Sequence, residues 1–415
     1  MPAIQKSSYF RRRGWKDLIF IAVVLLLGYA VKLFLDANNP TDYKKWNARP
    51  KLNLASAHQP SQAGADPCLF LAPSDARNQA EASGSIGDCS ELVPDGRELD
   101  VWEVKLWSGQ FFRIKSDLHV QDTIPLAFTR TYNPFDPAAP ANVPYLRHVY
   151  DLFLYGDRFP YTYLKWALPS GPNVLFKRIS PGTRYADAVY EEAMPSPKFE
   201  GARIDWNGFG WDITLEDGTT YLSPDAYRAK RPQQGSLVGI FDNAGNEVRL
   251  SREENGDLAE IESPGGRSIR LTYKDGLVAR VTDSTGNFVD YNYDSKGRPR
   301  DITDNQRQRE EYTYDDGNRI ATITASNGSK ALENTYDTNG RLVWMSIADE
   351  KTYQLKYDID EARQRGLVEI TGPSGDVTRV SLEANPEQGK AFYSVESVPK
   401  SAARRKSPPA QSNVR

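Results

Sequence analysis

The sequence predicts a mainly β protein, in which antiparallel hairpin repeats form a rolled sheet or solenoid after a separate β domain, with one N-terminal transmembrane helix. Three observations lead to this prediction: an N-terminal apolar run, alternation of bulky and polar residues from about residue 98, and a period of about 21 residues from residue 235. Tyr, Gly, Pro, Asp and Asn are frequent, whereas Cys, Met and His are scarce, which favours strands and turns over packed helices. The formal net charge of −3 provides no basic field that would indicate nucleic acid binding.

The apolar run "LIFIAVVLLLGYAVKLFL" covers residues 18–35, with Lys32 as its one charged residue. As a helix it would span about 27 Å at about 1.5 Å per residue, close to the ~30 Å hydrocarbon core of a bilayer. Residues 1–17 are basic, so they are expected in the cytoplasm and the rest of the chain outside. A cleaved signal peptide is the alternative, because the Gly-Tyr-Ala sequence at 28–30 has the small-x-small form of a cleavage site. Since the apolar run continues past that point, we expect an uncleaved signal-anchor in the inner or plasma membrane.

Residues 36–97 are expected to form an extracytoplasmic linker, because Ala, Asn, Pro, Ser and Asp dominate them. Cys68 and Cys89 lie in this linker, and on an oxidising side of the membrane a disulfide between them is plausible. Two unpaired thiols are the alternative. The tail over 396–415 is basic and rich in Ser and Pro, with almost nothing to bury, so we expect it to be disordered.

Residues 98–234 are expected to form an all-β domain. The segments "DVWEVKLWSGQFFRIKSDLHV" and "TIPLAFTRTYN" alternate bulky and polar residues, which is typical of half-buried strands. The segments "HVYDLFLYGD" and "GWDITLEDGTTYLS" have the same alternation together with Gly/Asp turn signals.

Residues 235–395 are expected to form the repeat array, because three features share one period. Apolar residues three apart recur as Leu258/Ile261, Val278/Val281, Pro299/Ile302, Ile320/Ile323 and Leu342/Met345. Tyrosines recur at the same spacing as Tyr273, Tyr293, Tyr314, Tyr336 and Tyr357. An aspartate directly follows four of them, and a glycine comes two or three residues later in three units.

Each unit is predicted to be a hairpin in which a Tyr-x-Tyr strand leads into an Asp/Gly turn and the return strand carries the apolar pair. The predicted turn residues are Asp294 with Gly297, Asp315 with Gly317, and Asp337 with Gly340. A lone hairpin is marginal in water, so stacked copies must bury one another's apolar faces.

The tyrosines leave two alternatives open. Pointing inward they would be core, and pointing outward they could form a ladder of flat amphipathic faces that suits sugar rings or protein partners. The candidates for ligand contact are Tyr291, Tyr293, Tyr312, Tyr314 and Tyr336.

We expect no catalytic residues, no metal site and no cofactor. His58, His119 and His148 are scattered without the spacing of metal ligands, and two Cys without neighbouring His do not make a zinc site. The sequence has no Gly-x-Ser-x-Gly elbow, phosphate loop or dinucleotide fingerprint. Acidic residues could supply a glycosidase-like pair, but the repeat accounts for most of them as turn residues.

The repeat resembles the YD repeat of Rhs proteins, which recurs in the extracellular part of teneurins. The segments "YNYDSKGRPRDITD", "YTYDDGNRIATIT" and "TYDTNGRLVWMSIAD" are similar to its Tyr-x-Tyr-Asp-x-x-Gly-Arg-Leu form. Residues 108–133 resemble the module that precedes Rhs repeats, through a Pro-Leu-x-Phe-x-Arg-x-Tyr-Asn core. Large Rhs proteins roll dozens of repeats into a shell around a C-terminal toxin. With five or six units and no toxin-sized domain expected here, the resemblance implies the fold without toxin delivery.

Together these features predict a membrane-anchored, non-enzymatic binding or scaffold module of the cell envelope, with a carbohydrate or protein ligand. One alternative is an orphan or accessory segment of an Rhs toxin or secretion system. Another is an envelope enzyme that acts on polysaccharide. The oligomeric state stays open.

Overall fold

The computed structural model describes residues 100–101, 103–132, 146–169, 173–193, 199, 201–226, 228–348, 351–385 and 390–398. Antiparallel strands dominate these residues, so the prediction of a mainly β protein is confirmed. The predicted transmembrane helix, Cys68, Cys89 and the tail beyond residue 398 lie outside the described residues. Among the residues that are described, no helix has the length and apolar character needed to span a bilayer.

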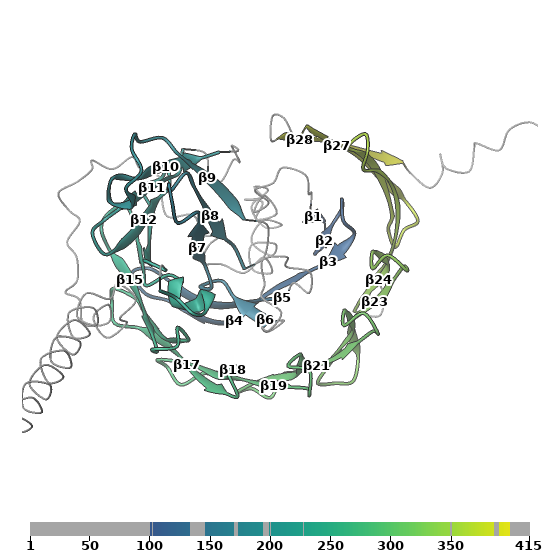
Figure 1. The fold of residues 1–415 in the computed structure, drawn as a ribbon. Helices are drawn as coiled ribbons and strands as arrows, with labels where there is room; N and C mark the ends of the chain where they lie inside the picture. The colour runs from purple at the N-terminus through teal and green to yellow at the C-terminus, as the bar shows by residue number, and fades with distance from the viewer. Residues whose placement is uncertain are drawn as a thin grey trace, which may run out of the picture.

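One continuous antiparallel sheet contains the strands β7 to β28, and each strand pairs with the next one along the chain. Its first part is β7 (Phe153–Gly156), β8 (Tyr163–Ala167), β9 (Val174–Arg178), the 3-10 turn η3 (Tyr185–Asp187), β10 (Val189–Glu192), β11 (Arg203–Trp206), β12 (Gly210–Thr214), β13 (Thr220–Pro224), the 3-10 turn η4 (Pro232–Gly235) and β14 (Gly239–Phe241). A bridge between Phe153 and Ser236 closes this part upon itself. We call it the lobe; it is the teal body of Figure 1.

The second part of the sheet continues from the lobe as a crescent of hairpins, which we call the array (Figure 1). Its strands are β15 (Glu247–Arg252), β16 (Leu258–Glu262), β17 (Ser268–Lys274), β18 (Leu277–Asp283), β19 (Phe288–Tyr293), β20 (Pro299–Asp304), β21 (Arg309–Tyr314), β22 (Ile320–Ala325), β23 (Lys330–Tyr336), β24 (Leu342–Ile347), β25 (Lys351–Asp360), β26 (Arg365–Thr371), β27 (Val377–Asn385) and β28 (Lys390–Val398). Repeated antiparallel hairpins are therefore present, as the sequence period predicts.

Six further strands lie within the crescent, and we call them the inner strands (Figure 1). They form two three-stranded sheets. The strands are β1 (Asp100–Val101), β2 (Val104–Lys105), β3 (Gln110–Phe111), β4 (Arg113–Val120), β5 (Leu126–Tyr132) and β6 (Leu146–His148).

The predicted β domain over 98–234 is thus divided between two places. The inner strands leave the main sheet, whereas β7 to β13 belong to it, and β13 pairs directly with β14 across residue 234. An unpaired strand edge exposes backbone N–H and C=O groups, so continuing the sheet satisfies the edge of β13. Alternation of bulky and polar residues predicts strands but not which sheet they join.

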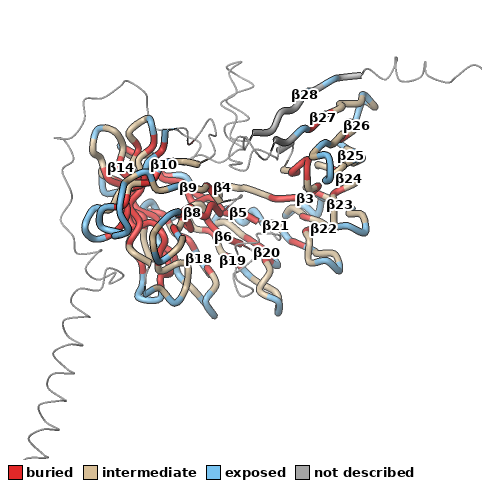
Figure 2. The backbone as a smooth tube through the Cα atoms, turned by 45° about the horizontal axis from the view of Figure 1, so that its top comes forward, coloured by how far each residue is buried: buried red, intermediate tan, exposed pale blue. Residues whose placement is uncertain are grey.

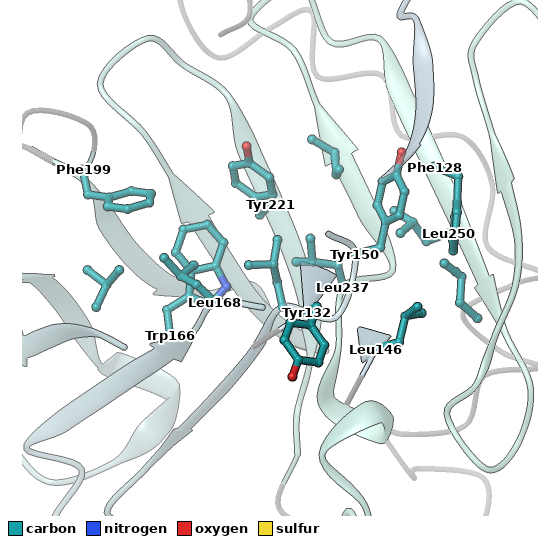
Figure 3. Close-up of a cluster of buried hydrophobic side chains, with 14 of the residues drawn as sticks. Phe128, Tyr132, Leu146, Tyr150, Trp166, Leu168, Phe199, Tyr221, Leu237 and Leu250 are labelled. Atoms are coloured by element: carbon teal, nitrogen blue, oxygen red, sulfur yellow. The ribbon is translucent and has the colours of Figure 1, made fainter. Parts of the chain in front are cut away.

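The core lies between the inner strands and the surrounding sheet, where Figure 2 shows the buried residues gathered. In the lobe, the ring of Trp166 packs 5.6 Å from Phe199 and 5.1 Å from Tyr221 between centroids. Figure 3 shows these rings in one cluster with Phe128 and Tyr132 of the inner strand β5. Burial of such apolar surface contributes about 25 cal/mol for each Å² and holds the two layers together.

The predicted apolar pairs of the array are all buried. In a regular strand, residues three apart point to opposite faces. A β-bulge removes this conflict: Asn292 pairs with Asp301 but Tyr293 pairs with Pro299, so Arg300 is an extra residue. The same shift of register occurs beside Arg252, Tyr273, Tyr314 and Tyr336. Each bulge turns both apolar residues of its return strand toward the core.

Candidate functional site

The turns of the array are built on the aspartate that follows the repeat tyrosine. Asp294 Oδ1 accepts hydrogen bonds from the backbone N–H groups of Lys296 at 2.9 Å and Arg298 at 3.0 Å. Asp294 Oδ2 accepts a bond from Arg298 Nε at 2.7 Å. Gly297 has a φ of 75°, a left-handed conformation that glycine adopts at little cost. The structure therefore places both predicted residues of this unit in its turn.

The next two turns show one difference from this arrangement. Asp337 and Gly340 repeat it, with a φ of 84° at Gly340. In the turn of Asp315, however, the left-handed residue is Asn318, with a φ of 63°, and not Gly317. Asn318 follows Gly317 directly and donates its N–H to the carbonyl of Asp315. Asparagine tolerates this conformation, so a glycine in the motif does not by itself mark the strained position.

The tyrosine that ends each Tyr-x-Tyr-like segment reaches back to the preceding unit. Tyr314 Oη donates to the carbonyl of Pro299 at 2.7 Å, and Tyr293 Oη donates to the carbonyl of Val278 at 2.9 Å. The equivalent bonds join Tyr273 to Leu258, Tyr336 to Ile320, and Tyr357 to Leu342. Burial raises the pKa of all five phenols, so they donate as neutral groups. We call these bonds the rungs.

In three turns of the array, an arginine covers the tyrosine of the next unit. The guanidinium carbon of Arg298 lies 4.2 Å from the centroid of the Tyr314 ring, and Arg298 also pairs with Asp294 at 2.6 Å. A cation over an aromatic face is attracted by the ring quadrupole. Arg319 and Arg341 lie in the same way over Tyr336 and Tyr357. The Asp and Arg of one turn thus couple each unit to its neighbour.

The first rung uses an arginine in place of the tyrosine. Buried Arg252 stands beside the first bulge of the array, and its Nε donates to the carbonyl of Leu237 at 2.8 Å, 15 residues earlier. Its Nη2 donates to the carbonyl of Tyr150 at 2.8 Å, just beyond the inner strand β6. The sequence reasoning missed this residue because no tyrosine marks the unit. Arg252 precedes Tyr273 by the same spacing that separates the repeat tyrosines, and this spacing could have identified it.

A group of buried charged side chains joins the inner strands to the array. Arg130 of β5 donates from Nε to the Asp117 carboxylate at 2.9 and 3.0 Å, and from Nη2 to Glu310 Oε2 at 2.6 Å. Lys115 Nζ donates to Glu310 Oε1 at 2.7 Å. We call Arg113, Lys115, Asp117, Arg130 and Glu310, together with Tyr291 and Tyr312, the charged cluster.

The two tyrosines of the charged cluster are the first tyrosines of their Tyr-x-Tyr pairs. Both are buried. Tyr291 Oη donates to Asp117 Oδ2 at 2.6 Å, and Tyr312 Oη donates to Glu310 Oε2 at 2.5 Å. Asp117 is on the inner strand β4, whereas Glu310 is on the same array strand as Tyr312, where Arg130 of β5 contacts both.

A protein-family model for the RHS repeat matches residues 293–330. This range includes the turn of Asp294, the bulges beside Tyr293 and Tyr314, and the rung from Tyr314 to Pro299. Residues 293–330 are therefore an Rhs/YD repeat. No curated protein sequence matches the chain.

Among solved structures, the Rhs chain is similar to the TcdB2-TccC3-Cdc42 crystal structure at 13% identity and a TM-score of 0.30, covering 64% of this chain and 15% of that one. It is similar to the Photorhabdus luminescens Tc holotoxin pore at 14% identity and a TM-score of 0.30, covering 66% and 16%. It is similar to a porin-like protein from Bacteroides uniformis at 11% identity and a TM-score of 0.21, covering 69% of this chain and 96% of that one. The chain spans about a sixth of the length of the Tc chains. No functional conclusion follows from similarities at this level.

The structure supports the first of the two alternatives for the candidate tyrosines, in which their rings belong to the core of the array. Tyr291 and Tyr312 belong to the charged cluster, and Tyr293, Tyr314 and Tyr336 are partly buried in the rungs. An exposed ladder of these five rings is not present. The reason is the hydroxyl group, because each phenol finds an acceptor within the protein: in the preceding unit for the rungs, on the inner strand β4 for Tyr291, and on its own strand for Tyr312.

Ion pairs set the protonation states in the charged cluster. Burial raises the pKa of Glu310, but Arg130, Lys115 and Arg113 outweigh it, so this pKa lies well below the ordinary value. Burial lowers the pKa of Arg130, but Asp117 and other cluster residues outweigh it, so this pKa lies well above the ordinary value. A general acid or base needs a pKa near the working pH, whereas the pKa values of Glu310 and Arg130 are both shifted away from neutral pH.

The charged cluster leaves no room for a substrate. The cavity beside it, lined by Arg130 and Tyr312 among others, has a volume of about 10 Å³. A second cavity beside His148 and Asp151 has about 40 Å³. Such volumes hold no more than a few water molecules. The cluster is therefore a structural junction that fixes the inner strands to the Rhs repeats.

The structure does not bring the histidines together. His148 is buried on β6, with Nε2 3.4 Å from Asp151 Oδ1, and burial lowers its pKa. His119 is exposed on β4, and His58 lies outside the described residues. Within the described ranges, no three His, Cys, Asp or Glu side chains are grouped as metal ligands.

Proposed function

We propose that this Rhs/YD-repeat protein is a non-enzymatic binding scaffold of the cell envelope. In this proposal, the predicted helix over 18–35 holds the chain in the membrane, and the β body lies on the outer side. The partner is a glycan or an envelope protein. The observation that supports a binding role most strongly is a continuous exposed aromatic surface at one end of the lobe.

Three neighbouring loops form this surface, which we call the aromatic end. Alternate connections of an antiparallel meander lie at the same end of the strands, so the β7–β8, β9–β10 and β11–β12 loops adjoin. They expose Phe159 (73%), Ile179 (50%), Tyr185 (44%) and Phe209 (57%). Single exposed apolar side chains are common on soluble proteins, but a contiguous group of them marks an interaction site.

Ring contacts show that the loops form one surface. The ring of Tyr185 lies 5.9 Å from that of Tyr161 and 5.0 Å from that of Trp206, at 90° to the latter. Trp206 packs in turn on Trp211 at 5.0 Å, and Phe209 belongs to the tight turn that follows Trp206. Edge-to-face packing of this kind fixes the rings before a partner arrives, which lowers the entropy cost of binding.

Photo-crosslinking tests the binding role. A benzophenone amino acid in place of Phe159, in the full chain in its native host, is expected to capture a partner on irradiation. The adduct is then identified by mass spectrometry and by glycan staining. The same amino acid in place of Ser295, which is exposed in an array turn, is the control and is expected to capture nothing. Equal adducts from both positions, or none from Phe159, would contradict the proposal.

A separate experiment tests the membrane anchor. Deletion of residues 18–35 is expected to move the chain from the membrane fraction to the supernatant. Protease added from outside is expected to digest the β body of the unaltered chain but to leave residues 1–17 protected. Continued recovery of the deleted chain in the membrane fraction would show that the segment is not the anchor.

A further inference from the structure

A groove lies on the outer face of the lobe, directly next to the aromatic end. Its volume is about 440 Å³, and it is lined by Thr162, Tyr163, Lys165, Leu175 and Lys177. Sites for small ligands typically have about 300–1,000 Å³. Among the cavities described above, this is the one with room for a molecule larger than water.

The pleat of β8 and β9 decides which side chains line this groove. Leu164, Trp166, Val174 and Phe176 are buried on the core face, so the alternate residues point outward. In the register of the two strands, Tyr163 lies opposite Lys177 and Lys165 lies opposite Leu175. Tyr155 of β7 lies opposite Lys165 on its other side. The groove therefore has two ammonium groups beside the phenol ring of Tyr163, and Tyr155 is the strand neighbour of Lys165 outside the lining.

The two lysines of the groove are not neutralised by a carboxylate within it. No carboxylate lines the groove, and neither Lys165 nor Lys177 has an ion pair there. The neighbouring carboxylates are engaged elsewhere. Asp157 accepts bonds from the Thr162 and Tyr163 backbone N–H groups at 2.8 and 3.0 Å. Glu191, opposite Lys177 on β10, lies 3.8 Å from Arg203 Nε.

We propose that this groove binds an anionic sugar unit of an envelope polysaccharide. The carboxylate or phosphate of the sugar lies between the ammonium groups of Lys165 and Lys177, and the ring of the sugar packs on Tyr163. Charge-assisted hydrogen bonds hold the anion, and the flat amphipathic face of tyrosine suits the C–H groups of a sugar ring. This inference rests on the proposed binding role and names a second contact surface for it.

Titration of the full chain in detergent with three defined probes tests the proposal. Hexagalacturonate supplies carboxylates, phosphomannan supplies phosphates, and maltohexaose is neutral. We expect at least one anionic probe to bind, with an affinity that falls as salt is added, and maltohexaose not to bind. Which of the two anionic probes binds decides between carboxylate and phosphate. Equal binding of the neutral probe, or no binding of either anion, would overturn the proposal.

Matched lysine variants locate the binding. Lys165→Gln combined with Lys177→Gln is expected to weaken the anionic probe about tenfold or more, with an unchanged melting temperature. Lys274→Gln, which removes an exposed lysine at the end of β17, is expected to leave binding unchanged. Equal affinity of the double variant and the unaltered chain would also overturn the proposal. If these titrations fail while Phe159 still crosslinks a partner, this inference is wrong and the proposed function stands.

Discussion

Arg130 and Tyr312 are 182 residues apart in the chain, yet the Arg130 guanidinium donates from Nη1 to Tyr312 Oη at 2.7 Å. This buried bond connects the inner strand β5 to the array strand β21. Other long-range bonds add to it: Tyr132 Oη donates to the carbonyl of Asn318 at 3.1 Å, and Leu342 N–H donates to the carbonyl of Gly109 at 2.8 Å. The inner strands are thus attached to several successive units and fix their curvature.

Loss of the Arg130 guanidinium is expected to weaken this attachment strongly. Arg130→Met keeps an unbranched apolar stem but removes the guanidinium, which leaves Asp117 and Glu310 without their main partner. We expect the free energy of unfolding to fall by about 3 kcal/mol, measured by urea unfolding with tryptophan fluorescence. Arg270→Met is the control, because the pair of Arg270 with Glu260 is exposed and should cost about 0.5 kcal/mol or less. Equal effects of the two variants would contradict the role of the cluster.

Glu310 is expected to make stability depend on acid pH. Because its folded pKa lies below the ordinary value, its contribution is present above the unfolded pKa of about 4.3 and is lost as pH falls below it. Glu310→Gln should therefore be less stable than the unaltered chain at pH 7, with the difference shrinking in acid. Melting temperatures of both proteins from pH 7 to pH 3 measure this. A difference that stays constant with pH would refute the expectation.

The rungs are expected to contribute one hydrogen bond each. Tyr314→Phe removes the bond to the carbonyl of Pro299 while keeping the ring under Arg298, so the unfolding free energy should fall by about 1 kcal/mol. Hydrogen exchange should also quicken in the β19–β20 hairpin. Tyr185→Phe is the matched control, since this ring lies exposed at the aromatic end. A loss at Tyr185 as large as that at Tyr314 would exclude the rung as the cause.

The turn glycines Gly297 and Gly317 are expected to respond differently to alanine. Gly297→Ala puts a Cβ on a left-handed backbone and should cost about 1 kcal/mol or more. Gly317→Ala should cost less, because its backbone is not left-handed and the added Cβ meets the movable guanidinium of Arg319. Thermal unfolding of the two variants measures the difference. A larger loss of stability for Gly317→Ala than for Gly297→Ala would contradict the assignment of the left-handed position to Gly297 and Asn318.

The sequence by itself determined the strands, the period and the repeat family. Alternation of bulky and polar residues marks strands because the side-chain period of a strand is two. The burial of apolar pairs such as Ile320 and Ile323 could also be predicted from the local sequence, because each repeated hairpin must bury its apolar residues against the neighbouring hairpins. The RHS-repeat match over 293–330 covers segments that already show the motif in the sequence.

Only the tertiary structure decided which way the tyrosines point and what they bind. A bulge beside Tyr293, like its equivalents in other units, changes the face of the sheet to which the following residues point. The spacing of residues in the sequence does not reveal a bulge. The bond of Arg252 to Tyr150 and the bonds of Arg130 to Glu310 and Tyr312 join residues more than a hundred positions apart. Such contacts follow from how the crescent curves around the inner strands, because curvature brings together side chains that local sequence cannot relate.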